Sequence, residues 1–142
     1  MAGLARAASA MARPDTLGKA RGNAARSLVC AMMAHPLLVS GEGRACAELM
    51  VAAKGRAAIK TGAEGVFLAI LPDMGVGVAI KIEDGATRAS EAAMAAVLVH
   101  LGVIAADDPA VQARLYKPLP SRRGLRAGGL RPHPGFAAAL GL

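Results

Sequence analysis

Aromatic side chains are almost absent from this 142-residue sequence. Two phenylalanines, one tyrosine and no tryptophan make up 2% of the residues, although hydrophobic residues reach 54%. The core must therefore be built from Ala, Val, Leu, Ile and Met, whose side chains each bury less area than an aromatic ring. The length fits one small domain. Stability then depends on many small contacts, and we expect the chain to gain from a partner surface.

Acidic residues are also few. Ten Asp and Glu face 17 Lys and Arg, which gives a formal net charge of +7. One interpretation is attraction to nucleic acid or an anionic surface. The cations are scattered, however, with local excess only in residues 1–26 and 121–131, and almost no aromatic rings are present to stack on bases. We therefore expect no nucleic-acid partner.

Cysteine and long apolar runs are scarce as well. Cys30 and Cys46 lie 16 residues apart, so they form no Cys-x-x-Cys metal or redox motif. We expect two buried thiols in a reducing compartment, and hence a cytoplasmic protein. No apolar run reaches the roughly 18 residues of a membrane span, so we expect no membrane partner.

The first 26 residues are rich in Ala and Arg and poor in acids. That composition also describes an organellar transit peptide. Pro14 and Asp15 fit a transit peptide less well, and there is no continuous apolar segment typical of a secretory signal. We favour a pair of ordinary helices over a targeting segment.

Periodicity predicts an α+β fold, an antiparallel sheet with packed helices. Val66–Leu71 and Val76–Ile82 should form a hairpin around the turn at Pro72, after a first strand at Ala57–Gly62. Leu37–Val39 is expected to be a connector, and the second helix to turn Leu28 and Met32 inward. The expected helices are Leu4–Met11, Asn23–His35, Arg44–Ala53, a segment from an N-cap at Thr87 to Gly102, and Asp108–Leu115.

Residues 117–142 are dominated by Pro, Gly and Arg. We expect this tail to be mostly irregular, with Leu125–Arg131 able to add one edge strand. A two-stranded hairpin is seldom stable alone, and its free edges seek further strands. The sheet therefore looks incomplete within this sequence.

The main candidate for chemistry is Lys60-Thr61-Gly62 at the end of the first strand, with Glu64 beyond it. A lysine there can supply a positive charge or a proton, and a glycine lets a substrate lie close to the strand. The alternative is a solvent-exposed strand-end lysine. No Ser-x-x-Lys or Gly-x-Ser-x-Gly nucleophile motif accompanies it, and Thr16–Lys19 is the nearest echo.

Metal ligands are not grouped in the sequence. His35, His100 and His133 are far apart, and His100 fits a satisfied helix-end residue. Asp84 and Asp108 lie where a turn and a helix N-cap are expected. We therefore predict no metal site and no cofactor within this chain.

Several blocks in a fixed order closely resemble the asparaginase II family, the rhizobial-type L-asparaginases. They extend over about a hundred residues, which makes the signal far more specific than Lys-Thr-Gly alone. The blocks are Ala31–Arg44, Leu49-Met50, Gly55-Arg56, Lys60–Gly65, Leu71-Pro72, Gly75–Gly85 and Arg88-Ala89, with a looser echo from Arg123 to Pro132.

The resemblance implies a fold similar to serine β-lactamases and glutaminases and hydrolysis of L-asparagine to aspartate and ammonia. Such enzymes are thought to use two serine–lysine pairs and to bind zinc through cysteines and a lysine. By this resemblance Lys60 is the lysine of the second pair, and Thr61, Gly62 and Glu64 line the substrate site beside it. The resemblance gives Lys81, on the next strand, a structural role.

Only the C-terminal part of the family is matched, by residues 1–116. The nucleophilic serine with its lysine, the second serine and the zinc cysteines belong to the family's N-terminal half. We therefore expect a truncated gene, a frameshift product or a misplaced start, and no activity of this chain alone. The alternative is a non-catalytic binding or assembly module that pairs with a separately encoded N-terminal half. A homodimer also stays open.

Overall fold

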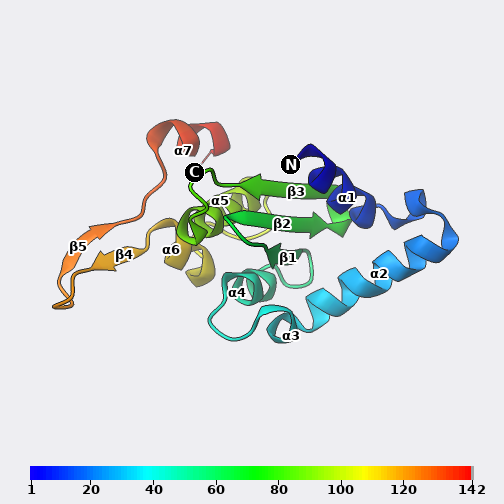
Figure 1. Cartoon of the computed structure of the whole chain (residues 1–142), viewed down its shortest axis with the longest axis horizontal. Coiled ribbons are helices and arrows are strands. Elements are labelled where there is room, and N and C mark those ends of the chain that lie inside the picture. The colour runs from blue at the N-terminus through cyan, green and yellow to red at the C-terminus, as the bar shows by residue number, and fades with distance from the viewer. Residues whose placement is uncertain (142) are drawn as a thin grey trace.

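The computed structural model describes residues 1–141 as a mixed α+β architecture (Figure 1). Single 3₁₀ turns at Pro14–Leu17 and Pro72–Met74 join neighbouring elements. Within the described residues, no helix combines the length and apolar character needed to cross a lipid bilayer. In chain order the helices and strands are α1 (Ala2–Ala12), α2 (Lys19–Ala34), α3 (Pro36–Ser40), α4 (Ala45–Ala52), β1 (Ala58–Thr61), β2 (Val66–Leu71), β3 (Val76–Lys81), α5 (Thr87–His100), α6 (Pro109–Leu115), β4 (Pro118–Pro120), β5 (Arg126–Gly129) and α7 (Pro134–Leu140).

The central sheet is an antiparallel meander in the order β1-β2-β3. Its three strands confirm the antiparallel sheet expected from the sequence. Tight turns connect them, with Gly65 and Gly75 in the left-handed region that glycine adopts without strain. The β2–β3 register pairs Phe67 with Ile80 and Leu71 with Val76. Each strand therefore presents one set of side chains to each face of the sheet.

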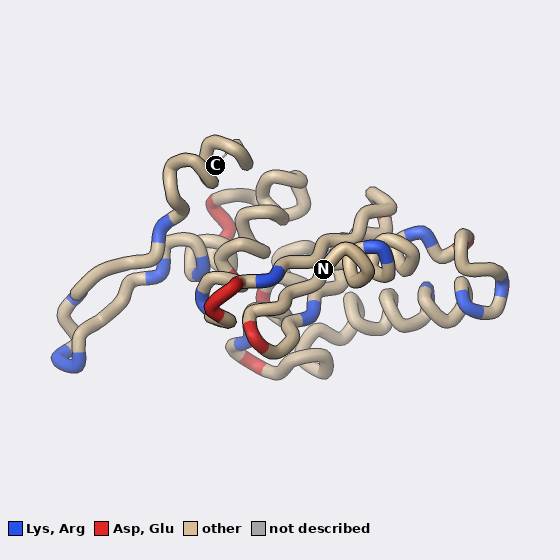
Figure 2. Tube along the Cα trace, turned by 45° about the horizontal axis from the view of Figure 1, so that its top comes forward, with Lys and Arg blue, Asp and Glu red and all other residues tan. Residues whose placement is uncertain are grey.

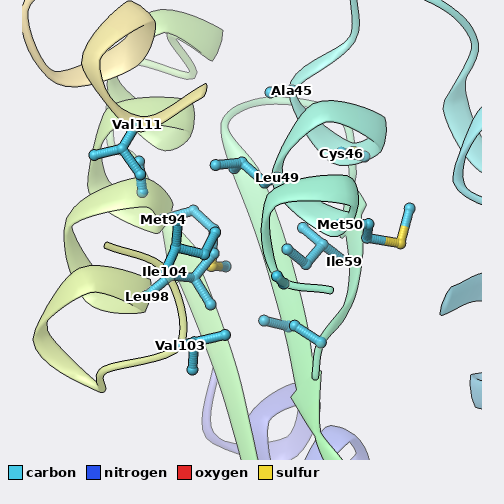
Figure 3. Packing of buried hydrophobic residues seen from close by; sticks show 14 of the residues in the cluster. Ala45, Cys46, Leu49, Met50, Ile59, Met94, Leu98, Val103, Ile104 and Val111 are labelled. Carbon is cyan, nitrogen blue, oxygen red and sulfur yellow. The ribbon is translucent and has the colours of Figure 1, made fainter. Parts of the chain in front are cut away.

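The main core lies between one face of the sheet and helices α4, α5 and α6 (Figure 3). Leu49 and Met50 from α4 meet Ile59 from β1, while Met94 and Leu98 come from α5. All five are 1% exposed or less. As the composition requires, this core contains a single aromatic ring, Phe67, and is otherwise filled by Ala, Val, Leu, Ile, Met and Cys side chains.

A second cluster fills the opposite face beneath α1 and α2. It joins Ala8 and Ala12 of α1, Val29 of α2, Ala58 of β1 and Ile70 of β2. Because most of these side chains are alanines, the helices can approach the sheet closely. Helices thus cover both faces of the sheet, whereas the sequence predicted only that helices pack on it.

The inward face predicted for the second helix is only half right: Met32 does pack against the cluster beneath α1 and α2, but Leu28 does not. The helix starts at Lys19 and buries Gly22, Ala25 and Val29, leaving Leu28 59% exposed. The reason is the turn at Pro14–Leu17, which folds back on the helix. A Cβ on Gly22 would lie 2.5 Å from the carbonyl oxygen of Pro14, so this contact fixes which side of α2 faces inward.

Two local expectations also need correction. Pro36–Ser40 is a short helix rather than a connector, with Pro36 at its first turn, where a missing N–H costs nothing. Thr87 does not cap α5, because the helix already begins there and Ala86 is its N-cap residue. The preceding turn is held instead by Asp84, whose Oδ1 accepts from the N–H of Ala86 at 2.9 Å. Asp108 does cap α6, accepting from the N–H of Ala110 at 2.8 Å.

The tail contains more regular structure than expected. The predicted edge strand exists as β5, but it pairs with β4 in a separate two-stranded sheet and not with the central sheet. A final helix, α7, follows. Its Leu140 carbonyl lies 2.7 Å from Nδ1 of His100, the helix-end histidine of α5.

One ion pair ties α6 to α4. Arg114 is 8% exposed and its guanidinium contacts the carboxylate of Glu48, whose side chain is 41% exposed. Glu48→Gln should lower the free energy of unfolding by about 1–3 kcal/mol, because it leaves the largely buried guanidinium of Arg114 without its ion-pair partner. The loss stays in this range because the Glu48 side chain is partly exposed and its charge is screened by solvent. Urea denaturation would measure it. Asp15→Asn breaks the exposed Arg26 pair with the same charge change and should cost below about 0.5 kcal/mol. Equal losses of stability in the two variants would refute the conclusion that the Arg114–Glu48 ion pair holds α6 to α4.

Candidate functional site

The candidate site is the end of β1 and the turn into β2. Lys60 is exposed, and its Nζ donates to the carbonyl oxygen of Thr61 at 3.0 Å. Among residues 1–141, no carboxylate lies within ion-pair distance of its ammonium group. Lys60 therefore presents an uncompensated positive charge to solvent at the strand end.

Thr61 and Gly62 are held tightly beside Lys60. The N–H of Thr61 donates to Sγ of Cys46 on α4 at 3.1 Å, and the N–H of Gly62 donates to the carbonyl oxygen of Val66 at 2.8 Å. A Cβ on Gly62 would lie 3.2 Å from Cβ of Val66, a contact tighter than usual. The strand end is thus fixed from both sides, and the space beside Gly62 that a side chain would occupy is bounded by Val66.

Glu64 lies in the turn itself, with an exposed side chain. It adopts a left-handed conformation, φ 53°, which is uncommon for a residue with a side chain. Lys81 at the end of β3 stabilises this turn, since its Nζ donates to the carbonyl oxygen of Glu64 and, at 2.8 Å, to that of Ile82. The structural role expected for Lys81 is therefore visible in these contacts.

Register places two lysines on one face of the sheet. Lys60 pairs with Leu68 of β2, and Lys81 pairs with Val66 two residues earlier in the same strand. Residues directly opposite in an antiparallel ladder share a face, as do residues two apart in a strand. Lys60 and Lys81 consequently lie on the α1–α2 side of the sheet, near its turn end. Lys81 is engaged by the turn, so Lys60 is the cation that remains available.

The four candidate residues thus cluster in one segment, but they lie on an open surface and not in a closed pocket. We call this surface, residues 60–64, the Lys60–Glu64 wall. A cavity of about 400 Å³ between α3, α4 and α6 is lined by Leu37, Ala47, Val51 and neighbours, and includes none of the four. No serine hydroxyl hydrogen-bonds Lys60 among the described residues. The wall can hold an anion or an oxyanion, but residues 1–141 place no activated nucleophile beside it.

Cys46 is the contributor that sequence reasoning missed. It was expected only as a buried thiol, and it is buried, but its sulfur also accepts from the N–H of Thr61. A spacing of 15 residues carries no signal for such a contact. Cys30 was expected to be buried and is exposed on α2, because the helix turns Val29 inward in its place.

The zinc that the family resemblance implies does not fit these residues. No group of three or more His, Cys, Asp or Glu side chains comes together in the part of the chain that the structure describes. Cys46 and Cys30 lie on different helices, and Cys46 already serves the strand end.

Comparison with known families gives one match. The family model of L-asparaginase II covers residues 1–132 of the 142. It includes β1, the Lys60–Glu64 wall, Lys81 and the β4–β5 ribbon. A search of curated proteins finds no match. The match extends over nearly the whole chain and contains every candidate residue, so the chain belongs to the L-asparaginase II family.

Proposed function

We propose that this chain forms the lysine-bearing wall of an amidohydrolase site that cleaves L-asparagine to aspartate and ammonia. The observation that carries the proposal is Lys60, which is exposed at a strand end and makes no ion pair within residues 1–141, in a chain of the L-asparaginase II family. In this reading the sheet and its helices are the C-terminal part of a fold similar to serine β-lactamases and glutaminases.

Each residue has a role that follows from its placement. The Lys60 ammonium can stabilise the developing charge on the amide oxygen or move a proton to and from a hydroxyl nucleophile. Thr61 and Gly62 form the surface along which the substrate lies, and Gly62 removes the side chain that would block close approach. Glu64, exposed at the turn, can accept from the substrate's ammonium group.

The nucleophile must come from elsewhere. Residues 1–142 contain no Ser-x-x-Lys motif, and a cation on a wall cannot form an acyl-enzyme without an attacking hydroxyl. We therefore propose that the serine belongs to a polypeptide segment outside these residues, which completes the site against the β1 end.

A second candidate function, assembly, is favoured by the outer edge of β3. The N–H of Ile82 donates across to Gly65 of the β2 side at 3.1 Å, so alternation turns the backbone groups of Gly77, Ala79 and Lys81 to the other edge. No loop or helix among the described residues hydrogen-bonds these groups. A separately produced segment could add a strand there, which makes this chain an assembly module whatever its chemistry.

One experiment tests both proposals. The purified chain is mixed with an N-terminal segment of a family member that carries Ser-x-x-Lys, and ammonia release from L-asparagine is followed. We expect no release from the chain alone, and release together with a raised melting temperature from the mixture, because a partner that binds only the folded state stabilises it. A raised melting temperature without ammonia supports assembly alone. Ammonia from the chain alone contradicts an external nucleophile, and no change in either quantity refutes both proposals.

A further inference from the structure

The β4–β5 hairpin forms an arm that extends from the body of the protein (Figure 1). We define the arm as residues 117–131. Every residue of its two strands is exposed, and within residues 1–141 the strands pair only with each other. Leu119 and Leu125 on the arm are 43% and 68% exposed. An isolated two-stranded ribbon of this kind has little stability in water. Binding to the surface of a partner would stabilise it.

The arm accounts for most of the net charge of the protein. Residues 109–142 contain six of the 17 cations and none of the ten acids, which leaves 17 − 6 = 11 cations against ten acids in residues 1–108. Figure 2 shows Lys and Arg colour along the arm and no Asp or Glu colour. The five arm cations make no ion pair among the described residues. They are Lys117, Arg122, Arg123, Arg126 and Arg131.

A cavity of about 540 Å³ lies at the base of the arm. Its lining combines the cations Arg126 and Arg131 with Tyr116, Leu130 and the backbone of Gly128 and Gly129. Guanidinium groups bind carboxylates through two parallel hydrogen bonds, and a tyrosine hydroxyl can add a third donor. The cavity is therefore suited to an anionic group carried by a partner.

The two edges of the arm differ in what they can bind. Pro118 and Pro120 have no backbone N–H, so the outer edge of β4 offers no donors at these positions and is poorly suited to pairing with a further strand. On β5, the N–H of Leu130 donates back to Lys117 at 2.8 Å, so the N–H of the preceding Gly129 points to the outer edge. The arm thus offers a free backbone donor on the strand that carries Arg126.

From this arrangement we propose that the arm binds an acidic, extended polypeptide segment of a partner protein. Its Asp or Glu side chains would pair with Arg126 and Arg131, and its backbone would hydrogen-bond Gly129. Exposed Leu119 and Leu125 favour a protein partner over nucleic acid, because a phosphate backbone offers leucine nothing to pack against. Tyr116 is the single aromatic residue in the lining of the cavity at the base of the arm, and residues 117–131 contain none, which leaves little surface for bases to stack on. This inference does not depend on the proposed amidohydrolase activity.

The test measures binding of a fluorescein-labelled octa-glutamate peptide to the whole chain, with a 20-base-pair DNA duplex as a second probe. Arg126→Gln/Arg131→Gln should weaken peptide binding roughly tenfold or more, because each lost guanidinium removes a charge-assisted contact. The matched control Lys19→Gln/Arg21→Gln removes the same charge from exposed positions of α2 and should change binding less than about twofold. Gly129→Pro, which removes the edge N–H, should weaken binding, whereas Gly129→Ala keeps that N–H and should leave binding unchanged.

The replaced residues all lie at exposed positions, so the melting curves of the four variants should overlay that of the unchanged protein. Equal losses in the two double variants would show attraction to net charge only, and would overturn the proposal. Tighter binding of the duplex through Arg126 and Arg131 would replace it with a nucleic-acid site. Absence of saturable peptide binding would refute it outright.

Discussion

Replacing Gly77 with alanine is expected to destabilise the protein by about 3 kcal/mol or more, because α1 lies directly on this residue of β3. A Cβ at position 77 would lie 2.1 Å from the backbone nitrogen of Ser9 and 2.5 Å from the carbonyl carbon of Ala8. Backbone atoms cannot rotate away as the end of a side chain can. The helix must therefore shift and give up the contacts of Ala8 and Ala12 with the sheet.

Urea denaturation gives the loss directly, and hydrogen exchange of α1 amides shows where it arises. Gly3→Ala is the matched control on the same helix, since no atom lies within 4 Å of the added Cβ. It should raise stability by about 0.5–1 kcal/mol through helix propensity. A loss below about 1 kcal/mol for Gly77→Ala would mean that α1 is not seated on β3 as the structure shows.

The consequence extends to the candidate site. Ala58 belongs to the cluster beneath α1 and α2, and Lys60 is two residues further along the same strand on the same face. If α1 separates from β3, the sheet face that carries Lys60 loses its contacts with Ala8 and Ala12 and becomes exposed to solvent. Gly77 is therefore a distant residue whose substitution should also weaken any activity of the completed site, in proportion to the fraction of α1 that is displaced.

Local patterning predicted the centre of this fold well. A continuous apolar run located β2, alternating apolar residues located β3, and the Met94–Leu101 spacing located α5, because each of these signals lies within a single element. The position of Lys60 at a strand end followed from the strand predicted at Ala57–Gly62, and the family was predicted from blocks in a fixed order.

What could not be predicted depends on contacts between distant segments. The inward face of α2 is set by Pro14 against Gly22, and the restraint on Thr61 comes from Cys46 on another helix. The pairing of β5 with β4, where the sequence suggested the central sheet, likewise depends on a turn rich in Arg and Gly that has no apolar periodicity. Hydropathy carries none of this information, since small or polar residues make these contacts.

The largest effect on function is expected at Lys60. Once an external serine segment restores ammonia release, Lys60→Ala should lower kcat/KM for L-asparagine about a thousandfold, the middle of the range for a lost proton-transfer or charge-stabilising group. Lys19→Ala, an exposed cation on α2, should leave kcat/KM within about twofold.

Lys60→Arg separates the two roles of this lysine. Arginine keeps the positive charge but does not release a proton, so it restores activity only if charge alone is required. If Lys60 moves protons, Lys60→Arg should stay within about tenfold of Lys60→Ala, and added small alkylamines should partly rescue Lys60→Ala. Activity of Lys60→Ala within threefold of the unchanged protein would remove Lys60 from the site. The L-asparaginase II family match would then stand without a functional lysine at this strand end, because Lys81 is already held by the carbonyl groups of Glu64 and Ile82.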